Sequence, residues 1–188
     1  MEEIQRCFGT GDSLMEKYHD EEWGVPVHDD RLLFEHLLLD GFQAGLSWRT
    51  VLHKRENFRR AFQGFDPERI ANYDDQDRAR LLADAGIIRN KLKINAAITN
   101  AQAYLDIVNQ LGSFSDFLWS FTEGETVKGP LTKTWGEIPT SSPESEAMSR
   151  ALKEHGFKFV GSTICYAFMQ AVGIIDDHLA DCFRFSGR

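Results

Sequence analysis

The sequence predicts an all-α protein, and three observations support this fold class. Helix-capping residues recur along the chain, each before a segment whose apolar side chains repeat every three to four positions. The alternation of apolar and polar residues that is typical of β-strands is essentially missing. The 188 residues, 42% of them hydrophobic, suffice for one substantial core, so we expect one compact unit over residues 1–188.

In the first half of the chain, amphipathic segments follow four capping residues, Asp30, Ser47, Asp66 and Asp74. The helix after Ser47 is expected to continue to Phe62, with an apolar stripe on one face. Proline follows Asp66 directly, which suits the first turn of a helix. Gly86 is expected to end the helix that Asp74 begins.

The second half is predicted to contain the longest helix, which Asn90 caps and whose apolar stripe runs from Ile94 to Val108. Further helices are expected at residues 115–121, 142–155 and 162–172. Between the first two of these, residues 124–142 carry prolines and a serine and threonine cluster. They predict a long surface loop.

A very short turn joins the helices that flank residues 85–91, which predicts a helix-hairpin-helix over about residues 75–111. Backbone N–H groups at the start of a second helix can bind a DNA phosphate without reading sequence. Gly86, Arg89 and Lys91 are the candidate contacts. An ordinary corner between two helices is the alternative.

The charge distribution qualifies this prediction. The net charge is −8, whereas nucleic-acid binding usually requires a basic surplus. Basic residues nevertheless gather in residues 48–63 and 85–95, and they could form a local phosphate-binding surface. The alternative is that both stretches are solvated helix faces.

Three cysteines do not make a disulfide framework, so metal ligation or simple burial is expected. His178 and Cys182 are four residues apart and would share one face of a helix. Cys7 and His19 have suitable chemistry to complete a closed, structural zinc site. Coincidence is the alternative for such a pair, and Cys165 lies in an apolar run that indicates burial.

No segment is long and apolar enough for a membrane span, and the acidic start is not typical of a signal peptide. We therefore expect a cytoplasmic protein that does not bind membranes.

Four motifs, in the same order, resemble the DNA-3-methyladenine glycosylase I family, and the resemblance runs essentially from end to end. They are YHDEEWGVP at residues 18–26, QAGLSW at 43–48, DAGIIR at 84–89 and FKFVGSTICY at 157–166. The resemblance implies the helix-hairpin-helix glycosylase fold and bacterial base excision repair. It also implies one structural zinc ion that joins the terminal segments, residues 1–28 and 160–188, through Cys7, His19, His178 and Cys182.

The same resemblance implies a base pocket built from Tyr18, Trp48 and an acidic residue, here Asp40, as the catalytic group. Family members usually have glutamate at this position. Phe42 also departs from the family, which usually has a polar residue there, and Phe42 is expected to shape the pocket. A carboxylate could accept a hydrogen bond from the base and stabilise its positive charge.

The damaged base must leave the duplex to be reached, and a side chain must fill the gap. Gln43 and Leu46, in the loop before Ser47, are the candidates, and packing at a helix entry is their alternative role. The expected partner is damaged double-stranded DNA, bound by a monomer without a nucleotide cofactor. Hydrolysis without strand cleavage is expected, because the hairpin holds no lysine placed as a Schiff-base nucleophile.

Two other functions remain open because of Asp40. The enzyme could act on a different range of lesions, with Asp40 and Phe42 accepting a bulkier alkyl group. Alternatively, the chain could be a non-catalytic module that binds damaged DNA.

Overall fold

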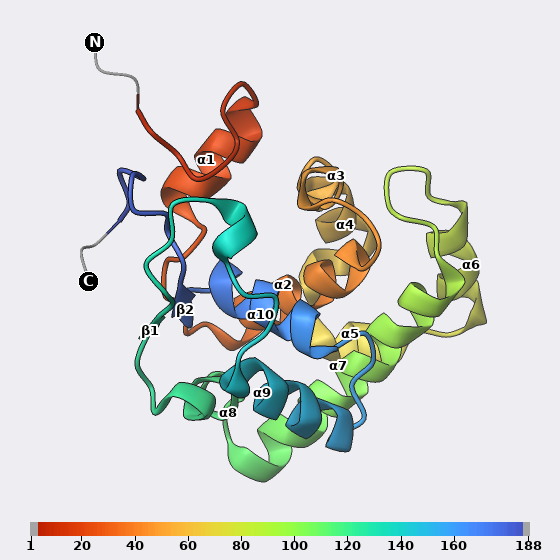
Figure 1. Ribbon diagram of the computed structural model, residues 1–188. Coiled ribbons are helices and arrows are strands. Elements are labelled where there is room, and N and C mark those ends of the chain that lie inside the picture. Colours follow the sequence, from red (N-terminus) through yellow and green to blue (C-terminus); the bar gives the residue numbers. More distant parts are fainter. Residues whose placement is uncertain (1–3, 186–188) are drawn as a thin grey trace.

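The computed structural model describes residues 4–185 as a mostly helical protein (Figure 1). Its α-helices are α1 Ser13–Glu21, α2 Asp30–Gln43, α3 Trp48–Leu52, α4 Arg55–Ala61, α5 Pro67–Ala71, α6 Asp75–Ala83, α7 Lys91–Leu111, α8 Phe114–Trp119, α9 Pro143–Glu154 and α10 Ser162–Ala171. The short 3-10 helices are η1 Gln63–Phe65, η2 Ser120–Thr122 and η3 Trp135–Glu137. Two strands, β1 Val127–Lys128 and β2 Ile175–Asp176, form a small parallel ladder.

Side-chain caps define the helix starts as predicted for α3, α5, α6 and α7. The side chains of Ser47, Asp66, Asp74 and Asn90 accept hydrogen bonds from backbone N–H groups of the first turns. These bonds satisfy amide groups that have no partner inside the helix. The sequence therefore places these helices through local chemistry.

Three predicted boundaries are wrong. Asp29, not Asp30, caps α2, while Asp30 accepts hydrogen bonds from the backbone N–H groups of Phe114 and Ser115 at the start of α8. The segment after Ser47 forms two helices, α3 and α4, because the chain turns at residues 53–54. Helix α6 ends at Ala83, before Gly86.

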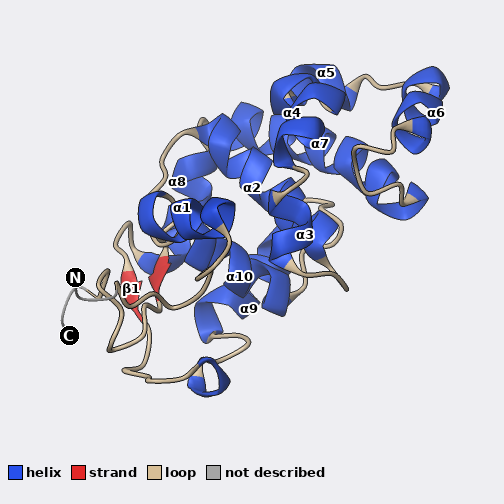
Figure 2. Cartoon of the chain, turned by 90° about the horizontal axis from the view of Figure 1, so that it is seen from above, coloured by secondary structure: helices blue, strands red, loops and turns tan. Residues whose placement is uncertain are grey.

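Helix α2 lies at the centre of the core and is buried at every position from Leu33 to Phe42. It packs against α3, α7, α8 and α10, so apolar residues cover most of its surface. Figure 2 shows α2 surrounded by these helices. A polar residue on α2 is consequently placed in a dry environment, which matters for Asp40.

The β1–β2 ladder, which the sequence did not predict, joins the loop after η2 to the segment after α10. A second connection links the two ends of the described chain, where the Phe183 N–H donates to the Gln5 carbonyl at 3.0 Å. The predicted terminal segments 1–28 and 160–188 thus meet, although residues 1–3 and 186–188 lie outside the described part. No helix within residues 4–185 combines the length and apolar character that a bilayer span needs.

Candidate functional site

A cavity of about 240 Å³ opens between α1, α2, α3, α10 and η3. Its walls are mainly aromatic. The lining residues are Phe8, Met15, Tyr18, Trp23, Asp40, Gln43, Trp48, Trp135, Ala167, Gln170 and Ala171. The structure thus brings together three predicted site residues, Asp40, Tyr18 and Trp48, with the predicted loop residue Gln43.

Asp40 is the only acidic residue in this lining, and it is 2% exposed. Within residues 4–185, its Oδ2 atom has no hydrogen-bond partner. Burial raises the pKa of Asp40 well above its usual value, because the charged form is poorly solvated there. A carboxyl group in this state is suited to pair with a cation or a hydrogen-bond donor that enters the cavity.

The aromatic side chains are arranged around Asp40 as faces and edges. The rings of Tyr18 and Trp48 lie 5.2 Å apart, and those of Phe8 and Trp23 also lie 5.2 Å apart. The Nε1 atom of Trp48 is buried and has no hydrogen-bond partner in the described chain. Burial raises the pKa of Tyr18 and keeps its hydroxyl neutral, so Tyr18 offers a ring face and a donor.

Sequence reasoning missed the other seven lining residues, which are Phe8, Met15, Trp23, Trp135, Ala167, Gln170 and Ala171. Phe8 precedes the first helix, whereas Trp135 lies on η3, more than 120 residues later. The indole N–H of Trp135 donates to the Cys7 carbonyl at 2.5 Å, which fixes this wall of the cavity. Of these residues, Trp23 lies within the family motif at residues 18–26, and that motif could have identified it. The other missed residues lie in none of the four motifs.

Phe42 corrects one prediction, because it does not line this cavity. Its ring is 2% exposed and packs against Phe58 and Phe62, with ring centroids 4.7 and 5.7 Å away. Asp40 and Phe42 are two positions apart on α2 and therefore project about 200° apart around the helix axis. Phe42 belongs to the core beneath α4.

A second cluster contains Cys7, His19 and Cys182, whose ligand atoms lie within 4.8 Å of one another. All three residues are buried. The ring of His178 lies beside this group, with its centroid 5.6 Å from that of His19. The structure therefore brings the four predicted metal ligands together from both ends of the chain.

The route to this cluster differs from the prediction, since His178 and Cys182 do not lie on a helix. They belong to an irregular segment after β2, in which the Cys182 N–H donates to the Leu179 carbonyl. The turn, and not helical spacing, directs both side chains inward.

Neighbouring groups orient the cluster. The Nδ1 atom of His19 lies 2.8 Å from a carboxylate oxygen of Asp20, and that of His178 lies 2.8 Å from one of Asp176. Both Nε2 atoms therefore point away from these carboxylates. Backbone N–H groups of Leu179 and Arg184 donate to the Sγ atoms of Cys7 and Cys182. Donors of this kind favour thiolates over thiols. Two thiolates and two neutral imidazoles are the donor set that zinc prefers.

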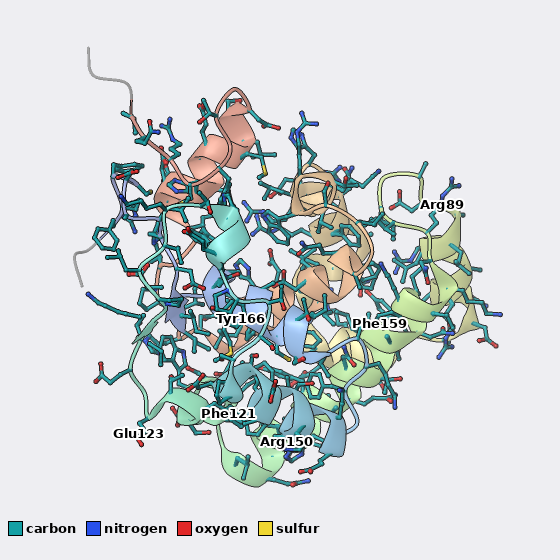
Figure 3. All side chains as sticks on the ribbon, in the orientation of Figure 1. Arg89, Phe121, Glu123, Arg150, Phe159 and Tyr166 are labelled. Carbon is teal, nitrogen blue, oxygen red and sulfur yellow. The ribbon has the colours of Figure 1, made fainter. Side chains whose placement is uncertain are left out.

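The hairpin between α6 and α7 exposes Arg89 and Lys91, whereas Gly86 is half-buried. Some of the backbone N–H groups that were expected to be free for a phosphate already have hydrogen-bond partners. The Gly86 N–H donates to Asp84 Oδ1 at 2.7 Å, and the Asn90 side chain accepts from the first turn of α7. Arg89 is labelled at the outer edge of the molecule in Figure 3.

The cations of the basic stretch at residues 48–63 have partners within the protein. Carboxylates pair with three of them, Arg49 with Asp12, Arg55 with Glu22, and Arg59 with Glu35 and Glu56. Lys54 and Arg60 contact neutral oxygens, those of Ala85 and Gly86 and that of Asn57. Lys54 and Asn57 in particular attach this stretch to the hairpin, because both donate to the Gly86 carbonyl.

Lys93, which belongs to the basic stretch at residues 85–95, fixes the loop after α2. It is 7% exposed, and its Nζ atom donates to the carbonyls of Phe42 and Ala44 at 2.8 and 2.6 Å. Gln43, the last residue of α2, lies in the cavity wall, and the loop that follows it leaves Leu46 45% exposed near the cavity residue Trp48. A fixed loop with an exposed leucine is suited to enter a gap in another molecule.

Comparison with known proteins identifies the family of this chain. The sequence profile of the methyladenine glycosylase family matches residues 8–185. The chain is 50% identical to DNA-3-methyladenine glycosylase 1 of Escherichia coli (strain K12) over 98% of each protein.

Solved structures agree as well. A crystal structure of a 3-methyladenine DNA glycosylase I has a TM-score of 0.92 and 52% identity, and the match covers 96% of this chain and 99% of that one. A structure of the Staphylococcus aureus glycosylase I, described as showing the basis of 3-methyladenine recognition, has a TM-score of 0.89 and 39% identity, with 94% and 93% covered. The chain that builds this aromatic, acid-containing cavity belongs to the methyladenine glycosylase family.

Proposed function

We propose that this protein is a DNA glycosylase that hydrolyses the N-glycosidic bond of 3-methyladenine in alkylated DNA. One observation carries the proposal: the buried Asp40 side chain, with an unpaired oxygen, lies in a cavity walled by aromatic rings. The names of the relatives in its family support the same activity.

The cavity is suited to select a cationic base. Methylation at N3 makes adenine positive, and aromatic faces attract cations by about 0.5 to 2 kcal/mol. The same charge would lower the pKa of Asp40 and favour its carboxylate, which can accept a hydrogen bond from the exocyclic amino group. Normal adenine brings no charge, so it would leave a buried carboxyl group uncompensated.

Hydrolysis breaks the bond between C1′ of the sugar and N9 of the base. The electron pair leaves with the base, which departs as neutral 3-methyladenine, and a water molecule adds to C1′ and releases one proton to solvent. Because the alkylated base is already a good leaving group, the residues need only stabilise positive charge and position the reactants. Among the described residues, those that line the cavity include no lysine, which supports hydrolysis without strand cleavage.

The base must first leave the duplex, at a cost of a few kcal/mol. Gln43 and Leu46 are placed to occupy the gap, because their loop is fixed by Lys93 at the cavity wall. Arg89 and Lys91 at the exposed hairpin are suited to hold the phosphate backbone. Double-stranded DNA in the bacterial cytoplasm, bound by a monomer, is part of the same proposal, and a single peak of 21.4 kDa by light scattering would support the monomer.

The test is release of free base from methylated duplex DNA by the purified protein under single-turnover conditions. We expect 3-methyladenine to be released, and Asp40→Asn to slow release by a factor of 100 or more. No release by the wild-type protein would contradict the proposal. If Asp40→Glu then created release, the non-catalytic alternative would be correct, whereas a preference for larger N3 adducts would indicate a shifted lesion range.

We also propose that Cys7, His19, His178 and Cys182 hold one zinc ion. The buried cluster, the Nδ1 partners Asp20 and Asp176, and the N–H donors at both sulfurs support this. The ion would have a structural role, because four protein ligands leave no open position for water. It would join the two ends of the chain.

A further inference from the structure

Phe159, in the loop between α9 and α10, combines two unusual properties. Its backbone φ is +57°, in the left-handed region that non-glycine residues rarely adopt, and its aromatic side chain is 37% exposed. A conformation of this kind costs free energy, and such residues concentrate at functional sites. Neither property is explained by the base cavity, which Phe159 does not line.

The residues on either side of Phe159 are held by buried side chains. Asn100 of α7, 3% exposed, donates to the Lys158 carbonyl at 3.0 Å and accepts from the Lys158 N–H at 2.7 Å. Ser149 donates to the Val160 carbonyl at 2.6 Å. The fold therefore imposes the strained conformation, which presents the ring of Phe159 at the surface.

The exposed ring forms one wall of an open groove of about 400 Å³, and its lining is Leu92, Asn95, Ala96, Thr99, Lys158 and Phe159. Leu92 is 70% exposed. The lining, which lies wholly within the described chain, has a lysine and no carboxylate. Apolar surface next to a cation suits a nucleic acid strand, in which bases and sugars alternate with phosphates.

This groove adjoins the C-terminal part of α2. Phe159 lines a small cavity together with Gly41, Phe42 and Lys93, and Lys93 is the residue that fixes the carbonyls of Phe42 and Ala44. The hairpin adjoins the other side, because Lys91 immediately precedes Leu92. In Figure 3, Phe159 and Arg89 are labelled toward the same side of the molecule.

We propose that Phe159 and Leu92 form a second apolar DNA contact, which packs against nucleotides next to the extruded one. This inference rests on the proposed function, which supplies the DNA substrate. The contact itself lies outside the base cavity. Aromatic packing against unstacked bases strengthens binding substantially and tolerates any sequence. The strained loop is then retained because it presents this ring to DNA.

The test measures binding to a duplex that contains an uncleavable abasic-site analogue, so its outcome does not depend on base release. The variants are Phe159→Asn, which tolerates the left-handed conformation, and Leu92→Asn. Leu111→Asn is the control, because Leu111 is 56% exposed at the other end of α7. We expect Phe159→Asn to raise Kd roughly 5- to 100-fold and the control to leave it unchanged.

The salt dependence of DNA binding distinguishes loss of this contact from a general loss of structure. Loss of an apolar contact leaves the slope of log Kd against log salt unchanged, whereas Lys158→Ala should reduce its magnitude by about 1 if Lys158 meets a phosphate. Binding of free 3-methyladenine should also be unchanged in Phe159→Asn. Kd values within twofold of wild type for both Phe159→Asn and Leu92→Asn would overturn the proposal. If the variants change Kd as expected but the wild-type protein releases no base, only the proposed function would be overturned.

Discussion

At the scale of single residues, Asp40 shows how a core helix creates a functional group. Its position in the buried part of α2 removes it from water, and one of its oxygens has no hydrogen-bond partner among the described residues. Sequence resemblance was sufficient to select Asp40, Tyr18 and Trp48. It was insufficient for Phe8 and Met15, because local sequence does not show which apolar side chains face a cavity and which face the core.

Replacing Asp40 by Asn should stabilise the fold at neutral pH while it impairs base release. The pKa of Asp40 is raised in the folded state, so the wild type loses stability as pH rises above the unfolded pKa of about 3.9. Asn carries no charge and avoids this penalty. We expect an unfolding free energy higher by roughly 1 to 3 kcal/mol at pH 7, measured by urea denaturation.

The pH dependence provides the control for this prediction. Below about pH 4, Asp40 is protonated in both the folded and unfolded states, so the stability difference from Asn should become small. Equal unfolding free energies of both proteins at pH 7 would show that burial of Asp40 has no electrostatic cost.

At the scale of elements, caps made most helix starts predictable, whereas contacts between elements did not follow from sequence. Asp29 and Asp30 are equivalent as caps by sequence, and only the position of α8 decides that Asp30 binds its N-terminus. Lys93 is a similar case. Its place in a basic stretch indicated a solvent-exposed cation, but the approach of α2 to α7 buries it against two carbonyls.

Replacing Lys93 by Met should loosen the loop at residues 43–46. The change keeps the apolar length of the side chain and leaves the buried Phe42 carbonyl and the partly buried Ala44 carbonyl without their donor, at a cost of about 1 to 3 kcal/mol. Because this segment joins Gln43 to Leu46, we expect a KM for methylated duplex raised about 10-fold or more. The matched control is Lys153→Met on α9, which is exposed and outside the proposed DNA contacts, so it should leave both the KM and the melting temperature unchanged.

The exposed hairpin should contribute mainly electrostatic affinity. If Arg89 and Lys91 each neutralise one phosphate, each substitution by Ala should reduce the magnitude of the slope of log Kd against log salt by about 1. The preference for damaged over undamaged DNA should stay the same, because phosphate contacts carry no base information. Slopes equal to that of wild type in both variants would exclude the hairpin as a phosphate site.

At the scale of the whole molecule, the two ends of the chain close on each other beside the base cavity. The Phe183–Gln5 hydrogen bond and the Cys7, His19 and Cys182 cluster join them. The prediction that both ends meet required the resemblance to a known family. Spacing alone gave only the His178 and Cys182 pair, and it placed that pair on a helix that does not exist.

Metal removal should therefore destabilise the whole fold. We expect elemental analysis to find about one zinc ion per chain in the wild type. The variant Cys182→Ser should lose this zinc, and its melting temperature should be lower by several degrees. Cys165→Ala is the matched control, because Cys165 is buried outside the cluster and should keep the metal. A wild-type protein that contains no zinc and resists chelators without loss of stability would refute the metal site.

The distribution of cavity residues along the chain has a consequence for synthesis on the ribosome. Phe8, Tyr18, Asp40 and Trp48 are made more than 100 residues before Gln170 and Cys182. A nascent chain thus exposes half of an apolar pocket until α10 has been made, and a chain that terminates before α10 never closes the pocket. Recognition of a damaged base is consequently a property that the polypeptide acquires only after α10 has been added.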